Sequence, residues 1–367
     1  MAQANSFPQV VLNDETLRDG LQIEREGLTV DDKRALLEML LDAGITSVMA
    51  GAFVNPKWSP QMADTAELIR KIVPRSGVRY TALALNERGR QQCREFSPPL
   101  AVDDRIGTHL YACDVFMLRN TNTTAQEQED RWMRPIAAAR ERGATEAGMA
   151  ISAGWGSNWK GVFTHEARME LLKKQHDAWT AARIAVTSLS FADPMAWCTP
   201  SALAQDLTAI LERFPLVRNF NLHLHNARGM AMACAWEALR TLDQRHVLRL
   251  DASLGGIGGC PYCGNGQATG MLPMEDLVQM LHAAGIDTGI NLHALVEASH
   301  HLASLLGRPL SSQVSRNGPL PAAGKGYSED LPVLYTFDEA QHFRLGPNAV
   351  HPERTRPWLK KLNGDKT

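Results

Sequence analysis

The sequence predicts an α/β fold, a closed (β/α)8 TIM barrel of parallel strands ringed by helices, with extra C-terminal helices and an extended tail. Two observations predict it. Strand-like and helix-like segments alternate with a spacing of about 30 to 45 residues, as in repeated β-α units. Eight such units follow one another, the number that closes a barrel. We expect the barrel over residues 1–290, an additional packed helical segment over 291–316, and a C-terminal extension over 317–367.

Each predicted strand is a short apolar run bounded by turn-forming residues. Such runs are typical of buried parallel strands, whose two faces are both covered. The eight strands are expected at 10–12, 45–49, 80–85, within 109–118, and at 148–152, 184–191, 220–223 and 247–252.

The helices are predicted between the strands. Thr29 caps the first helix and Gly44 ends it, while Pro200 suits the first turn of a later one. After the barrel, 292–306 has the apolar spacing of an amphipathic helix. From Asn317 onward Pro and Gly are frequent, so the tail is either an arm over the barrel or partly disordered. A second helix is expected after the loop at 53–60 and to end at about residue 73. The remaining helices are expected at 125–142, 164–181, 199–214, 230–242 and 274–284.

Composition limits the function classes. Hydrophobic residues make up 44% and charged residues 21% of the 367, with a formal net charge of −2, so nothing indicates a nucleic-acid or membrane partner. The first residues lack the basic flank and apolar core of a signal peptide, and no apolar run approaches the ~20 residues of a membrane helix. Six cysteines without an export signal are typical of free thiols. We expect a cytoplasmic protein.

Arg18 and Asp19 lie side by side where the first strand passes into a loop. In a barrel, catalytic residues lie at the carboxyl ends of the strands or in the loops that follow. A guanidinium binds planar oxygen anions through paired hydrogen bonds, and a carboxylate suits a hard divalent cation. Together the two residues could hold a metal-bound, enolate-like anion. The alternative is a surface turn with an ion pair.

His223 and His225 follow the seventh strand. Because alternate residues of an extended chain point the same way, both imidazoles can face one ion. A lone His-x-His pair can also be incidental, but barrel closure would bring Asp19 close as a third ligand. Two imidazoles and a carboxylate suit Mg²⁺, Mn²⁺, Co²⁺ or Zn²⁺. We expect Mg²⁺ or Mn²⁺ first.

A Gly-rich loop with Cys260 follows the eighth strand. A thiol there could act as a general acid or base. A structural thiol is one alternative, and a redox or zinc pair with Cys263 is another, although no second Cys-x-x-Cys exists. Asp193, after the sixth strand, is a further candidate for the barrel mouth, although Asp before Pro is often a turn residue.

Five stretches resemble the 3-hydroxy-3-methylglutaryl-CoA lyases, within the wider group of metal-dependent barrel lyases and Claisen synthases. The resemblance covers roughly residues 10–314, and its Pro-Lys-Trp-x-Pro-Gln-Met run is specific to the lyase branch. The matching stretches are 16–22 (TLRDGLQ), 53–62 (FVNPKWSPQM), His223-x-His225, 258–262 (GGCPY) and 275–277 (EDL).

The resemblance implies a role for each matching residue. Asp19, His223 and His225 are implied as metal ligands, and Gln22 as a substrate contact. Arg18 is implied to stabilise the enolate oxygen. Cys260, on a mobile loop, is implied to donate or accept the proton, and Asp193 matches the family's acidic residue after strand six.

The chain also departs from the family pattern. The family usually has Glu at Met49, Tyr at Ala150 and a metal-binding Asn at Met271. Since methionine is a poor ligand for a hard cation, either water fills that position or Asn265 in the lengthened loop substitutes. The loss of Glu and Tyr, together with the presence of Trp155 and Trp159, predicts a reshaped substrate pocket. Met49 and Trp155 are its predicted lining.

The expected function is a divalent-metal-dependent carbon–carbon lyase. It would cleave a 3-hydroxy acid or its CoA thioester into a carbonyl product and an enolate. The alternatives are an aldolase or Claisen-type synthase acting on a 2-oxo acid, and a non-catalytic metabolite-binding barrel. The expected partners are a small hydroxy acid or acyl-CoA substrate, and the extra helices could provide a homodimer contact.

Overall fold

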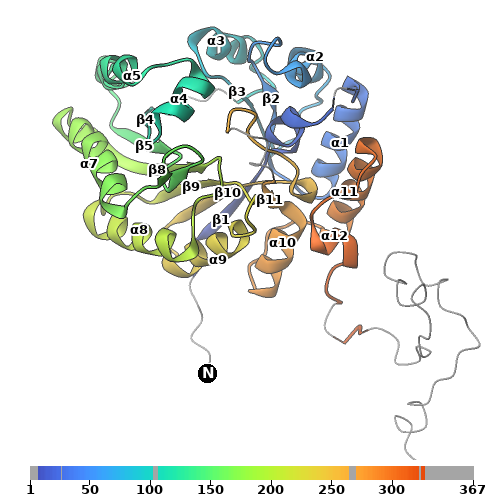
Figure 1. Cartoon of the computed structure of the whole chain (residues 1–367). Coiled ribbons are helices and arrows are strands. Elements are labelled where there is room, and N and C mark those ends of the chain that lie inside the picture. Colours follow the sequence, from blue (N-terminus) through green and yellow to red (C-terminus); the bar gives the residue numbers. More distant parts are fainter. Residues whose placement is uncertain (1–6, 26, 102–105, 264–269, 322–323, 327–367) are drawn as a thin grey trace, which may run out of the picture.

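The computed structural model describes residues 7–25, 27–101, 106–263, 270–321 and 324–326 (Figure 1). A central parallel sheet has the strand order β3-β2-β1-β10-β9-β8-β5-β4, and β11 pairs with β10. Helices surround it, so the predicted α/β barrel is confirmed. The strands are β1 Gln9–Asp14, β2 Ser47–Ala52, β3 Arg79–Leu83, β4 Gly107–Tyr111, β5 Glu146–Ser152, β8 Ala185–Asp193, β9 Asn219–Leu224, β10 Val247–Ser253 and β11 Leu272–Pro273.

Between β3 and β4 the described residues contain no ladder, which differs from the prediction of a fully paired barrel. Instead Tyr80 of β3 forms a parallel bridge with Leu100, and the Ala101 N–H donates to the Tyr80 carbonyl at 2.8 Å. The chain that leads toward β4 therefore takes the place beside β3. β6 (Gly156–Ser157) and β7 (Gly161–Val162) form a separate hairpin after β5.

The helices largely follow the predicted spacing. The Thr29 hydroxyl accepts the Asp32 N–H and the Asp32 side chain accepts the Thr29 N–H, a capping box at the start of α1. The helix predicted over 125–142 is instead two helices, α5 and α6. The helices are α1 Val30–Asp42, α2 Thr65–Arg70, α3 Glu87–Glu95, α4 Asp114–Thr121, α5 Ala125–Arg131, α6 Arg134–Glu141, α7 His165–Ala181, α8 Pro200–Arg213, α9 Ala231–Thr241, α10 Met274–Ala283, α11 Leu292–Leu306 and α12 Gln313–Asn317.

Helices α11 and α12 occupy the predicted extra segment and are joined to the barrel. The Asn291 N–H, just before α11, donates to the Ala43 carbonyl after α1 at 2.8 Å. The Ser312 hydroxyl, which caps α12, donates to the Asp276 carboxylate of α10 at 2.7 Å. Most of residues 317–367 lie outside the described residues. In the described part of the chain, no helix combines the length and the apolar character needed to cross a bilayer.

Candidate active site

The chain after β1 forms one buried π-helical turn, Thr16–Gly20. The Asp14 carboxylate fixes its start by accepting the Thr16 N–H at 3.0 Å and the Thr16 hydroxyl at 2.8 Å. Burial raises the pKa of Asp14 to about 7. Such turns are frequent at functional sites. This one holds Arg18 and Asp19 inside the carboxyl-terminal rim of the sheet.

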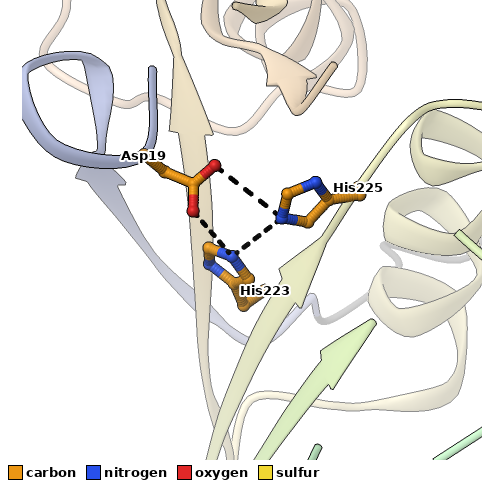
Figure 2. Close-up of side chains that lie close together, drawn as sticks. All are labelled: Asp19, His223 and His225. Carbon is orange, nitrogen blue, oxygen red and sulfur yellow. Dashed lines mark hydrogen bonds and ion pairs between the residues drawn. The ribbon is translucent and has the colours of Figure 1, made fainter. Parts of the chain in front are cut away.

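Asp19, His223 and His225 converge from opposite ends of the sequence (Figure 2). One ligand atom from each lies within 4.8 Å of the other two. The Nε2 atoms of His223 and His225 are 3.2 Å apart, and they lie 3.7 and 3.8 Å from the two Asp19 oxygens. Nitrogen and oxygen donors that face one another in this way fit a divalent cation, so the structure brings the three predicted ligands together.

The protonation of the three side chains is consistent with ion binding. Burial lowers the pKa of His225 to about 4, so this imidazole is neutral near pH 7 and can act as a ligand. Burial also opposes charge on Asp19, but Arg18 and the two imidazoles outweigh it and lower the pKa of the carboxyl. Asp19 is therefore a carboxylate.

His223 is held by a carboxylate, Asp251, that is not among the residues predicted from the sequence. The Asp251 oxygen lies 3.0 Å from His223 Nδ1, which leaves Nε2 to face the ion site. Burial lowers and this contact raises the pKa of His223, and the rise is larger. Asn13 Nδ2 donates to Asp251 at 3.0 Å and to Glu15 at 3.1 Å, so one amide joins the support of His223 to that of Arg18.

Arg18 is 9% exposed, and its guanidinium lies between two carboxylates. Its Nε donates to Glu15 at 2.7 Å, and its Nη1 donates to Asp19 at 2.5 Å. Burial opposes the charge, but these carboxylates raise the pKa of Arg18, so the cation is permanent. A buried, oriented cation beside an ion ligand can stabilise an oxyanion that forms there. Glu15, which orients it, was also missed from the sequence.

The Gly-rich loop after β10 packs directly on Asp19. The Gly259 N–H donates to the Asp19 carboxylate at 3.2 Å, and Gln22 Nε2 donates to both Asp19 and the Gly259 carbonyl at 3.0 Å. Gly258 has φ +130°, and a Cβ there would lie 3.0 Å from Asp19 Oδ1, so the close approach requires glycine. Cys260, which follows Gly259, is half-buried and packs against a small apolar cluster that includes Met195 and Cys263.

Cys263 and Asp193 complete this rim. The buried Cys263 thiol donates to the Pro194 carbonyl at 3.3 Å. The Asp193 carboxylate accepts the N–H groups of Trp197 at 3.0 Å and Cys198 at 2.7 Å. Burial raises the pKa of Asp193 to about 6. The His225 N–H donates to the Asp193 carbonyl at 3.3 Å, which places the acid next to an ion ligand along the rim.

The predicted substrate residues do not all meet at this rim. Met49 lies on β2 and is half-buried. It comes two residues after Ser47, whose hydroxyl donates to Asn13 in the barrel interior. Trp155 differs from expectation, because it is 2% exposed and its Nε1 donates to Asp206 of α8 at 2.8 Å. Its indole belongs to the packed interior in this structure.

Two of the family departures have different outcomes. Met271 is fully buried and its backbone forms an antiparallel bridge with His225, so it does border the ion site. Asn265, the predicted substitute ligand, lies outside the described residues.

A cavity of about 500 Å³ lies beside the carboxyl ends of β2 and β3. Since these strands belong to the same sheet as β1 and β9, the cavity shares the rim with the ion ligands. Its lining includes both apolar and polar side chains, among them Phe53, Asn55, Thr65, Asn86, Arg88 and Gln92.

Comparisons with known proteins agree with one another. Residues 9–302 match the HMGL-like family model. The chain is 33% identical over 316 residues to the mitochondrial hydroxymethylglutaryl-CoA lyase of Bos taurus, with 86% of this chain and 91% of the relative covered. It is 33% identical over 321 residues to the (R)-citramalyl-CoA lyase of Chloroflexus aurantiacus, covering 85% and 95%. A solved HMG-CoA lyase of Acinetobacter baumannii, in complex with coenzyme A and 3-methylmalate, has a TM-score of 0.70 at 26% identity, covering 91% and 100%.

Proposed function

The chain belongs to the HMGL-like family, whose named relatives are carbon–carbon lyases, and we propose that it cleaves a 3-hydroxyacyl-CoA thioester by way of an enolate, using a divalent metal ion. The observation that carries the proposal is the position of Arg18. Its guanidinium contacts Asp19, which itself faces His223 and His225. Enolate chemistry needs a fixed positive charge beside a Lewis-acid site, and this arrangement supplies both.

Asp19, His223 and His225 would hold the ion. An ion bound there would supply Lewis acidity, which lowers the proton affinity of a substrate hydroxyl. Mg²⁺, Mn²⁺, Co²⁺ and Zn²⁺ all accept imidazole and carboxylate ligands, with different preferences.

The remaining chemistry falls to the protein's own residues. Asp193 accepts the proton of the 3-hydroxyl group, because a carboxyl with a pKa of about 6 is mostly ionised at pH 7. As the carbon–carbon bond breaks, the carbon that carried the hydroxyl becomes a carbonyl carbon. The electron pair of the broken bond passes to the thioester enolate. Arg18 stabilises the developing enolate oxygen. Cys260 then donates a proton to the enolate carbon.

A CoA thioester is favoured over a free 2-oxo acid by two observations. The two curated relatives named above are both lyases of CoA esters, according to their names. The cavity lined by Asn86 and Arg88 offers space and polar groups on the same rim, beyond the atoms that react. A CoA ester needs such room, whereas a small oxo acid does not.

The test is a screen of the metal-loaded protein against 3-hydroxyacyl-CoA esters, the corresponding free acids and 2-oxo acids. We expect cleavage of at least one CoA ester and competitive inhibition by free CoA. Cleavage of a 2-oxo-acid aldol product that free CoA does not inhibit would replace the proposal with an aldolase.

Replacing Cys260 by Ser is expected to lower turnover at least ~100-fold while ion binding stays within ~3-fold, because the hydroxyl is a much weaker acid than the thiol. Turnover is measured at saturating substrate and ion binding by calorimetry. The matched control is Cys263→Ser, in the same loop, which should keep most of the turnover. Loss of the ion in Cys260→Ser would make the thiol a ligand instead.

Two further proposals concern the setting of the enzyme. The exposed faces of α11 and α12 are proposed as a homodimer contact, which sedimentation equilibrium can test. The chain is proposed to act in the cytoplasm.

A further inference from the structure

A methionine, Met271, borders the ion site at the position where the family pattern has an asparagine. We propose that Met271 makes the site selective for a late first-row divalent ion, Co²⁺ or Zn²⁺, over Mg²⁺. The inference rests on the proposed ion site of Asp19, His223 and His225, but it does not depend on which substrate is cleaved.

The backbone around Met271 is fixed on both sides. Its N–H donates to the Gly256 carbonyl at 3.1 Å, and the residue forms an antiparallel bridge with His225. The neighbouring Gly270 donates its N–H to the Gly258 carbonyl at 2.8 Å. Residue 271 is therefore held between an ion ligand and the loop that packs on Asp19.

The side chain of Met271 lies close to the Asp19 carboxylate. A Cβ built at Gly258 would lie 3.0 Å from Met271 Cγ and 3.0 Å from Asp19 Oδ1, so these two atoms are at most about 6 Å apart. Met271 is 0% exposed. An apolar chain with a soft thioether thus borders the ion site and excludes water from that side.

In the part of the chain that the structure describes, the ion site has two imidazole donors and one carboxylate donor. Among the described residues, the only other group of potential ligands around His223 consists of Glu15 and Asp251. Both are engaged elsewhere, since Glu15 accepts from Arg18 and Asp251 contacts His223 Nδ1. Neither of these two carboxylates is therefore free to join the ion ligands.

This donor set accepts Mg²⁺ less well than Co²⁺ or Zn²⁺. Mg²⁺ demands near-octahedral oxygen ligands and gives up its water reluctantly. Imidazole ligands favour Co²⁺ and Zn²⁺, which also accept four-coordinate or five-coordinate geometry. An amide oxygen at residue 271 would add a hard donor, whereas the Met271 thioether adds none. We expect the side chain at residue 271 to set the affinity of the site for Mg²⁺ relative to its affinity for Co²⁺ and Zn²⁺.

Within the described part of the chain, the imidazole of His225, which lies next to residue 271, lacks the second contact that usually orients a metal-binding histidine. Its Nδ1 is buried and has no hydrogen-bond partner among the described residues, whereas the Nδ1 of His223 faces Asp251. A metal-binding histidine is usually oriented through its second nitrogen. The backbone of His225 is bridged to Met271, so residue 271 lies next to this ligand.

The test is calorimetric titration of the chelator-treated full-length protein with Mg²⁺, Mn²⁺, Co²⁺ and Zn²⁺ salts. For the wild type we expect Co²⁺ and Zn²⁺ to bind at least ~100-fold tighter than Mg²⁺. In Met271→Asn we expect Mg²⁺ and Mn²⁺ to bind at least ~10-fold tighter than in the wild type, with Co²⁺ changed less than ~3-fold. Met271→Leu, which keeps the shape and apolar character, should resemble the wild type. Asp19→Asn should weaken the binding of every ion, which would show that the titrated site is the one that contains Asp19.

Two results would overturn the inference. One is Mg²⁺ binding to the wild type as tightly as Co²⁺. The other is a folded Met271→Asn, shown by circular dichroism, whose Mg²⁺ affinity is unchanged. If that variant does not fold, Met271→Gln takes its place, since its amide oxygen is also a hard donor, and an unchanged Mg²⁺ affinity in it would equally overturn the inference. A protein that selects Co²⁺ but cleaves no CoA ester would support this inference and refute the proposed function, so the two can be told apart.

Discussion

Arg18→Gln is expected to lower turnover at least ~100-fold, the loss typical of removing an oxyanion donor. Arg18 is the buried cation that contacts the ion ligand Asp19, and glutamine keeps hydrogen-bonding ability while removing the charge. The effect should appear in kcat more than in KM, because the enolate charge exists only on the reaction path. Steady-state kinetics with the CoA ester found in the screen provide the measurement.

Two variants control for this prediction. Glu15→Gln should cause a smaller loss, since Arg18 Nε keeps an acceptor while the guanidinium loses one of its two carboxylate partners. Arg90→Gln changes an arginine that pairs with Glu87 on the surface of α3 and should have no effect on turnover. Arg18→Gln with near-normal turnover would show that Arg18 does not stabilise the enolate.

Replacing an ion ligand is expected to have the second large effect. His225→Ala should lose the ion and nearly all activity, because two ligands remain of three. Asp251→Asn should weaken ion binding by about 10-fold to 100-fold, the usual loss when the partner of a metal-binding histidine is changed. Metal content after gel filtration and calorimetric titration measure both effects.

The matched test without mutation is chelation. Treatment of the wild type with a chelator should abolish activity, and adding back a divalent ion should restore it. Full activity in a protein shown to be free of metal would contradict the role given to Asp19, His223 and His225.

The rim residues that lie close in sequence to strand ends could be predicted from the sequence. Arg18 and Asp19 follow β1, and His223 and His225 alternate along the end of β9, so strand periodicity and barrel geometry place them on one rim. The eight-unit spacing predicted the barrel for the same reason. Both inferences depend only on local periodicity and on a rule of fold geometry.

The supporting residues could not be predicted in this way. The amide of Asn13 on β1 donates to Glu15 and, across to β10, to Asp251. Such contacts depend on the register of the two strands, which local periodicity does not give. Asp251 lies near the carboxyl end of β10, so the rule that barrel active sites lie at the carboxyl ends of strands could have indicated it as a candidate. Trp155 is predicted as a pocket residue from the departures from the family pattern, but its indole nitrogen donates to Asp206 in the interior.

The central claim is an enolate formed beside Arg18 and the ion ligands. Its most direct test is exchange of α-hydrogens of acetyl-CoA, the simplest acyl-CoA with such hydrogens, in D₂O with the metal-loaded protein. Mass spectrometry should detect deuterium in the acetyl group at a rate above the enzyme-free control, and the rate should fall in Arg18→Gln and in Cys260→Ser. Exchange at the enzyme-free rate by a protein that has bound its ion and cleaves a CoA ester would contradict the enolate mechanism.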